Sequence, residues 1–284
     1  RKSCSFSHMG KTRKKYSRNY YKSAKLPPCD FLDSDTDLVP KEVIKRFNSA
    51  KVDLEVSSFF TETLRTLKSV QEANPHLVVI DKIVCFGLGH FAWCPASRNQ
   101  LALITLIREQ LKVQEILFQD PIFTPKEVEI LKLLGFSVIP GNLEGKFVTE
   151  DKKYLFYLPH CPKQLTNNLL WSNWGSRLSN ILFLCNSFSG VLTSGPATSL
   201  RIDAGLIIKA EKFTEEIPLK NTFTFTDVFN DTSIHIFPQK KLEEITETSW
   251  NDRGPEPDYT DPEFITSASQ SSNGIFREDT EIPA

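Results

Sequence analysis

The chain has 284 residues, of which 40% are apolar, and a formal net charge of −1 at pH 7. That length and apolar content suffice for one α/β domain with a sizeable core, and the near-zero net charge supplies no overall attraction to nucleic acid. No apolar run approaches the roughly 18 residues of a membrane-spanning helix, so we expect neither a transmembrane segment nor a membrane partner.

The two ends of the chain carry opposite charge. Residues 1–37 include nine Lys or Arg before the first acidic residue, and residues 246–284 contain nine Asp or Glu against two Arg. Both segments are poor in branched apolar residues, so we expect disordered tails around an α/β domain at 38–245. The basic tail allows a weak polyanion contact, and no other nucleic-acid contact is expected.

Apolar periodicity predicts alternating helices and strands in the first half of the domain. The expected elements are a helix at 41–70, a strand ending at 86, a helix at 97–112, a strand at 115–119, a helix at 125–134 and a strand at 136–139. A β-α-β-α-β succession of this kind predicts parallel strands joined by right-handed crossovers. We therefore expect a single Rossmann-like, mostly parallel, doubly wound sheet with flanking helices.

The second half of the domain continues the alternation less regularly. It is expected to contain a strand at 154–158, a helix at 163–171, a strand at 180–185, a helix at 200–212 with a weak point at Gly205, and strands at 222–229 and 233–237.

The turn Gly87-Leu88-Gly89 follows an apolar run and precedes a predicted helix. Such a turn lets a phosphate or sugar approach bare backbone, and Asp120, at the end of the next strand, is placed to bind a ribose hydroxyl. The third glycine of the dinucleotide fingerprint is missing, with Trp93 near its place. The alternative is a tight strand-to-helix turn with no ligand.

Other polar residues follow the predicted strand ends and complete a candidate ligand site, namely His90, His160, Asn167, Asn168 and Asn186. His160 is the candidate general base, because an imidazole with a pKa near 6.5 changes its protonation close to neutral pH. It could equally be a structural histidine that hydrogen-bonds a loop carbonyl. Asn167 and Asn168 could instead cap a helix or bond loop backbone.

The six cysteines show no zinc-type spacing and no CxxC pair, so we expect no metal site. Cys85 and Cys185 lie inside apolar runs, and buried thiols there indicate a reducing compartment. Two Cys-Pro pairs begin at Cys94 and Cys161. An exposed thiolate in such a pair can ligate haem iron, which makes both cysteines haem-ligand candidates. The alternative is that both pairs are ordinary turns before a helix.

Several motifs, taken together in their order and spacing, resemble the SRR1-like family. They are Cys85-Phe86-Gly87-Leu88-Gly89, Gln100-Leu101-Ala102, Gln119–Phe123, Leu158–Pro162, Asn167–Trp174, Cys185–Phe188 and Phe229–His235. The resemblance implies a regulatory role in input to the circadian clock, with links to haem metabolism and microtubules and with cytoplasmic and nuclear placement. It implies regulatory protein partners and supplies no established catalytic residue.

The strand-end layout is also similar to that of S-adenosylmethionine methyltransferases, in which the first strand ends in a glycine turn and the second in an acid. Cys85 and Phe86 stand where those enzymes carry an acid before the first glycine. The alternative function is therefore an S-adenosylmethionine- or nucleotide-dependent transferase, and we favour the regulator over the enzyme.

Overall fold

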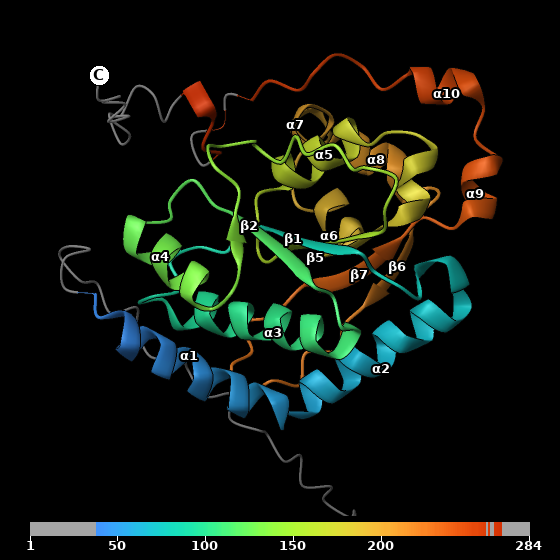
Figure 1. Ribbon diagram of the computed structural model, residues 1–284. Helices are drawn as coiled ribbons and strands as arrows, with labels where there is room; N and C mark the ends of the chain where they lie inside the picture. Colours follow the sequence, from blue (N-terminus) through green and yellow to red (C-terminus); the bar gives the residue numbers. More distant parts are fainter. Residues whose placement is uncertain (1–37, 260, 262–263, 269–284) are drawn as a thin grey trace, which may run out of the picture.

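The structure is a computed structural model that describes residues 38–259, 261 and 264–268 (Figure 1). The basic segment 1–37 lies outside the described residues, and so does the end of the acidic segment, 269–284. The expectation of disorder stays a prediction for both.

Seven strands of the described chain form one sheet in the order β3-β2-β1-β4-β5-β7-β6. Their bounds are β1 Lys82–Phe86, β2 Glu115–Gln119, β3 Ser137–Val138, β4 Tyr154–Leu158, β5 Ile181–Asn186, β6 Glu215–Pro218 and β7 Thr232–Ile236. The strands β1 to β5 pair in parallel, whereas β7 is antiparallel to both of its neighbours, β5 and β6. This confirms a Rossmann-like, mostly parallel, doubly wound sheet.

Helices cover both faces of the sheet (Figure 1). One face carries α1 Pro40–Glu55, α2 Ser58–Ala73, α3 Pro95–Leu111 and α4 Pro125–Leu133, and the other carries α5 Lys163–Ser172, α6 Phe188–Leu192, α7 Ala197–Asp203 and α8 Gly205–Glu211. The short helices α9 Gln239–Glu243 and α10 Glu247–Asn251 follow the last strand. No helix in the described part of the chain is long and apolar enough to cross a bilayer.

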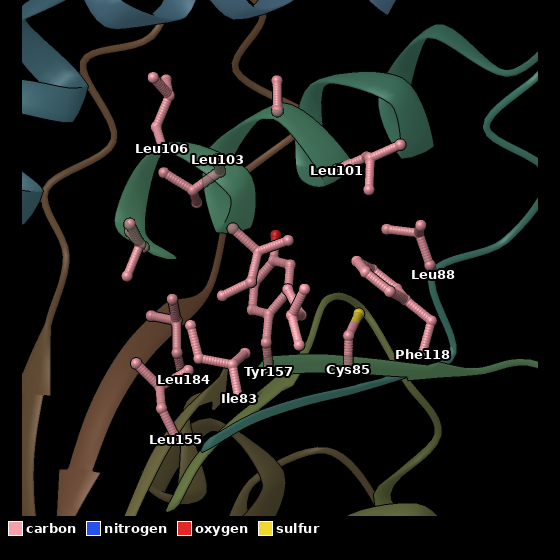
Figure 2. Close-up of a cluster of buried hydrophobic side chains, with 14 of the residues drawn as sticks. Ile83, Cys85, Leu88, Leu101, Leu103, Leu106, Phe118, Leu155, Tyr157 and Leu184 are labelled. Atoms are coloured by element: carbon pink, nitrogen blue, oxygen red, sulfur yellow. The ribbon is translucent and has the colours of Figure 1, made fainter. Parts of the chain in front are cut away.

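Side chains alternate between the two faces along each strand and so build two cores. In β1, Ile83 and Cys85 join the core under α3, while Val84 and Phe86 join the core under α5 and α8. Figure 2 shows the first core, in which Tyr157 and its neighbours on the sheet lie below the leucines of α3. Because both faces are buried, the strands read as continuous apolar runs rather than as alternating ones.

The predicted helix at 41–70 is two helices in the structure, α1 and α2. Ser57 lies between them, and its side-chain oxygen accepts a hydrogen bond from the backbone N–H of Phe60 at 3.1 Å. This N-cap starts a new helix, and α2 then extends beyond the predicted end to Ala73. The predicted helix at 200–212 is likewise divided at its weak point, Gly205, into α7 and α8.

The strand predicted at 222–229 is absent, and residues 215–218 form β6 instead. The alternating Thr-Phe pattern suggested a strand, but its rings pack on α2. Phe229 stacks on Phe59 with ring centroids 4.5 Å apart, and Phe223 contacts both of these rings. Aromatic packing, rather than a β ladder, therefore holds this segment.

The domain boundary expected at residue 245 lies too early. Part of the acidic segment forms α10, and beyond it Tyr259 and Phe264 are buried with exposed fractions of 7% and 5%. Their rings pack edge to face, with centroids 5.2 Å apart. The segment is poor in branched apolar residues, but two aromatic side chains supply enough apolar surface to attach it to the domain.

Candidate functional site

The carboxyl ends of β1, β2 and β4 meet at one edge of the sheet and border a cleft of about 200 Å³. Among its lining residues are Gly87, Gly89, Asp120, His160 and Cys161, so the structure brings together much of the predicted site. The contacts of each residue decide what this cleft can do.

Both glycines of the turn adopt positive φ, 63° at Gly87 and 77° at Gly89. A β-carbon at Gly87 would collide with Sγ of Cys161, and one at Gly89 would lie 2.8 Å from Oγ of Ser97. The space into which a β-carbon would point is therefore filled by the protein's own side chains. The glycines are required by a tight turn, as in the alternative without a ligand.

Both carboxylate oxygens of Asp120 accept backbone hydrogen bonds, one from the turn after β1 and one from the turn after β2. Oδ2 accepts the backbone N–H of Gly89 at 2.7 Å, and Oδ1 accepts that of Ile122 at 3.1 Å. Burial raises the pKa of Asp120, although these hydrogen bonds oppose the rise. A bound phosphate would need the N–H of Gly89, and a bound ribose would need the carboxylate of Asp120. In the structure these two groups are bonded to each other.

Glu127 is a functional residue of the turn that sequence reasoning missed. Its fully buried carboxylate accepts from Nδ1 of His90 at 2.9 Å and from the backbone N–H of Ala92 at 3.0 Å. It also forms a capping box with Thr124 at the start of α4. The Thr-x-x-Glu spacing shows the cap in the sequence, but only the fold reveals that the same carboxylate fixes His90.

His160 lies at the rim of the cleft with a positive φ of 52°. Its Nε2 is 3.0 Å from the carbonyl oxygen of Val228, which also accepts from the side-chain amide of Gln100 at 3.1 Å. Since a carbonyl only accepts, Nε2 carries the proton and donates. This is the structural role that the sequence left open, and it ties the loop before β7 to the cleft.

The neighbouring amides of α5 are buried, and each donates one hydrogen bond and accepts one. Asn167 accepts from the backbone N–H of Leu206 at 2.8 Å, which caps α8, and donates to the hydroxyl of Tyr259 at 2.8 Å. Asn168 donates to the carbonyl of Glu144 at 2.7 Å and accepts from the same Tyr259 hydroxyl at 3.1 Å. The pair therefore binds the acidic C-terminal segment.

The end of β5 is joined to the cleft through Asn186, whose side-chain amide donates to the carbonyl of Cys161 at 3.1 Å. This contact fixes the backbone at the start of α5. Each predicted polar residue at the strand ends thus hydrogen-bonds another part of the fold.

The environment of Cys161 argues against its role as a haem ligand. Its thiol is buried and donates to the carbonyl oxygen of Phe86 at 3.2 Å, and burial raises the pKa of Cys161 well above its usual range. Iron ligation needs an accessible thiolate, which this site disfavours. Both Cys-Pro pairs stand at helix starts: Pro95, after the half-buried Cys94, is the first residue of α3, and Pro162 is the N-cap residue of α5.

A second polar cluster joins β5, β6 and β7. Sγ of Cys185 lies 3.6 Å from Nδ1 of His235, whose Nε2 accepts from the backbone N–H of Phe188 at 3.2 Å. Burial lowers the pKa of His235 to about 4 and raises that of Cys185. A neutral thiol beside a weakly basic imidazole does not make a nucleophile, so the cluster is structural.

Burial alone would raise the pKa of Glu216 in this cluster, but hydrogen bonds from Ser187 and Ser189 lower it. Glu216 therefore remains ionised beside His235. Among the described residues, no three His, Cys, Asp or Glu side chains are arranged to hold a metal ion.

The fold and the cleft define a Rossmann-like α/β protein whose strand-end polar groups hydrogen-bond other parts of the fold. Residues 62–236 match the SRR1 domain, which covers the whole sheet. The chain belongs to the SRR1-like family.

Similar proteins come from animals and plants. The chain is 34% identical over 180 residues to an SRR1-like protein of Mus musculus, covering 52% of this chain and 72% of the relative. It is 30% identical over 214 residues to an SRR1-like protein of Drosophila melanogaster, covering 75% of both. Protein SENSITIVITY TO RED LIGHT REDUCED 1 of Arabidopsis thaliana is 30% identical over 199 residues, covering 65% of this chain and 70% of the relative.

Solved structures give a more distant likeness. MtNAS in complex with MTA and tNA is 13% identical with a TM-score of 0.36, covering 72% of this chain and 78% of that one. The 23S rRNA methyltransferase ErmE is 9% identical with a TM-score of 0.33, covering 65% and 72%.

Proposed function

We propose that this chain is an intracellular regulatory protein that acts through protein partners in an input pathway to the circadian clock. Links to haem biosynthesis and to microtubule-related processes, and placement in both cytoplasm and nucleus, belong to the same proposal. The observation that carries it is the family match over residues 62–236, together with the relative in Arabidopsis thaliana that is named for red-light sensitivity.

The contacts in the cleft support binding rather than turnover. Both carboxylate oxygens of Asp120 and Nε2 of His160 form hydrogen bonds with backbone groups that hold loops to the sheet. A catalytic group needs a polar atom directed at a substrate, and the bonded atoms of Asp120 and His160 are directed at backbone. A rigid surface built on such a site suits the recognition of a partner.

A rescue experiment tests the regulatory proposal. In cells whose own copy of the gene is disrupted, a clock-driven luciferase reporter should change its period, and the wild-type chain should restore it. The His160→Ala variant should restore the period as well, because a regulator does not need a general base. If His160→Ala accumulates to the wild-type level but fails to rescue, chemistry at His160 is indicated instead.

A transferase that uses S-adenosylmethionine or a nucleotide is the second candidate, favoured by the position of the cleft at the carboxyl ends of β1, β2 and β4. A thermal-shift screen of the full chain with nucleotides, S-adenosylmethionine and haem tests it. A ligand at 100 times its dissociation constant stabilises by about 2.7 kcal/mol, which such a screen detects. A shift with S-adenosylmethionine, lost in Asp120→Ala, would favour the transferase.

A further inference from the structure

The acidic C-terminal segment lies over the helical layer that flanks the cleft. We name the described residues of 252–268 (252–259, 261 and 264–268) the strap. In Figure 1 the strap leaves α10 and crosses the layer of α5, α7 and α8 toward the opposite side of the molecule. Its contacts reach back across more than 80 residues of sequence, to α5 and to the loop before β4.

The central anchor of the strap is Tyr259. Its hydroxyl accepts a hydrogen bond from Asn167 and donates one to Asn168, and both amides are buried with exposed fractions of 3% and 0%. The two amides therefore satisfy both the acceptor and the donor capacity of one phenol. Such a pair recognises a tyrosine specifically, because a phenylalanine would leave both amides with unpaired groups.

Further contacts run along the strap on either side of this anchor. The amide of Gln164 donates to Asp261 at 2.9 Å, the amide of Asn142 donates to the carbonyl of Ile265 at 2.8 Å, and Glu144 accepts both the N–H and the hydroxyl of Ser267 at 2.7 Å. The side chains of α5 and of the loop at 142–146 thus bind a tyrosine, an acid two residues later and main-chain groups beyond. These bonds are polar and partly exposed, so they are individually weak and reversible.

The strap also closes one side of the strand-end cleft. Phe264 and Ile265 line the cleft together with Gly87, Asp120 and Cys161. With the strap in place the cleft measures about 200 Å³. Sites for small molecules span roughly 300–1,000 Å³, so the cleft is too small for a nucleotide-sized ligand while the strap is bound.

We propose that the strap is a displaceable occupant, supplied by the chain itself, of a peptide-binding groove on α5 and the loop at 142–146. In the bound state it closes the strand-end cleft. An extended peptide with the same pattern, a tyrosine followed by an acid at the second position and an aromatic residue at the fifth, competes for the groove and opens the cleft. This inference goes beyond the regulatory role and does not depend on the pathway that the protein serves.

Thiol labelling of the full chain tests this proposal. Cys161 lines the cleft under the strap, whereas Cys185 does not line the cleft and is buried in β5 beside His235. N-ethylmaleimide labelling, quantified at each cysteine by mass spectrometry, should rise at least fivefold at Cys161 in Tyr259→Ala and stay unchanged at Cys185. Ser267→Asp, which sets a second carboxylate against Glu144, should produce the same change by an independent contact.

Tyr154→Phe is the control, because it removes a phenol hydroxyl at the amino end of β4, whereas the cleft lies at the carboxyl end of that strand. Labelling of Cys161 should equal that of the wild type in this variant. The proposal is overturned if Cys161 stays protected in both strap variants. It is also overturned if Cys161 and Cys185 become reactive together, since that pattern means that the strap is an inseparable part of the core.

The groove is tested separately with a synthetic peptide of residues 252–268. Added to the Tyr259→Ala protein, the peptide should restore protection of Cys161, and a peptide carrying Tyr259→Phe should need at least a tenfold higher concentration. Asn168→Ala in the Tyr259→Ala protein should abolish the rescue. Equal potency of the two peptides would refute recognition of the tyrosine by the amide pair.

Discussion

Single polar side chains determine how the strand-end cleft is built. The carboxylate of Asp120 bridges the turn after β1 and the turn after β2 through the backbone N–H groups of Gly89 and Ile122. Glu127 connects α4 to His90 in the same region. Both acids therefore replace, with intramolecular bonds, the interactions that a bound ligand would supply.

Replacing Asp120 tests this structural role. Asp120→Ala should lower the free energy of unfolding by about 2 kcal/mol, because it leaves backbone N–H groups without an acceptor. Asp120→Asn keeps one acceptor oxygen and should lose less. Urea denaturation of the two variants and the wild type measures the difference. An unchanged midpoint for Asp120→Ala would contradict the structural role and make Asp120 a ligand-binding candidate again.

Tyr157 offers the opposite case. Its hydroxyl is buried in the core under α3 and has no hydrogen-bond partner among the described residues (Figure 2). Tyr157→Phe removes the unpaired group without changing the ring, so it should raise the free energy of unfolding by about 1 kcal/mol. Chemical denaturation provides the measurement. A loss of stability would mean that a bound water pairs with the hydroxyl.

At the scale of elements, most strands and the helices at 97–112 and 125–134 could be predicted, because their apolar runs and caps are local signals. The strands at β1, β2, β4, β5 and β7 follow the sequence expectation within a residue or two. The segment at 222–229 could not be predicted, because its period-two pattern is that of a strand while its rings pack on α2. Long-range packing decides such cases.

The candidate site shows the same division. The glycine turn and the polar strand ends were visible in the sequence, and the structure brings many of them to one cleft. Their bonding partners were not visible, since Gly89 meets Asp120 across 31 residues and Asn168 meets Tyr259 across 91. A sequence therefore names the polar groups at a site without revealing whether they bind each other or a ligand.

The junction of β5, β7 and α6 makes the protein sensitive to acid. The buried His235 has a pKa lowered from 6.5 to about 4, so the unfolded chain takes up a proton that the folded protein refuses. Above pH 6.5 the imidazole is neutral in both states, and the free energy of unfolding is not affected by it. As the pH falls toward 4, protonation of the unfolded chain lowers the free energy of unfolding by about 3 kcal/mol. His235→Gln should flatten the dependence of the urea midpoint on pH between 4 and 6.5.

Nuclear magnetic resonance provides a direct control for that prediction. The imidazole signals of His235 should titrate with a midpoint near 4 in the folded protein. A midpoint near 6.5 would contradict the assignment of the acid sensitivity to this residue.

At the scale of the whole molecule, the domain does not end with β7. Residues after 245 add α10 and the strap, which bury Tyr259 and Phe264 against the layer of α5. A composition poor in branched apolar residues suggested a disordered tail, but two aromatic anchors and a row of buried amides suffice to attach it. Truncation therefore affects the two parts of the acidic segment differently.

Deletion of residues 246–284 should lower the free energy of unfolding by about 3–6 kcal/mol, since each of the two buried aromatic rings contributes about 1.5–3 kcal/mol. Deletion of 269–284 alone is the control, and its composition predicts almost no change. Differential scanning fluorimetry compares both with the full chain. Equal melting temperatures for the two deletions would show that the strap adds nothing to stability.

The position of β7 between β5 and β6 has a consequence for synthesis of the protein. The apolar strand Ile181–Asn186 leaves the ribosome long before Thr232–Ile236, the partner that covers its outer edge. At about 5–20 residues per second, this edge stays open for seconds on the nascent chain. An uncovered apolar strand edge pairs readily with other chains, so newly made protein should depend on chaperones until translation reaches β7.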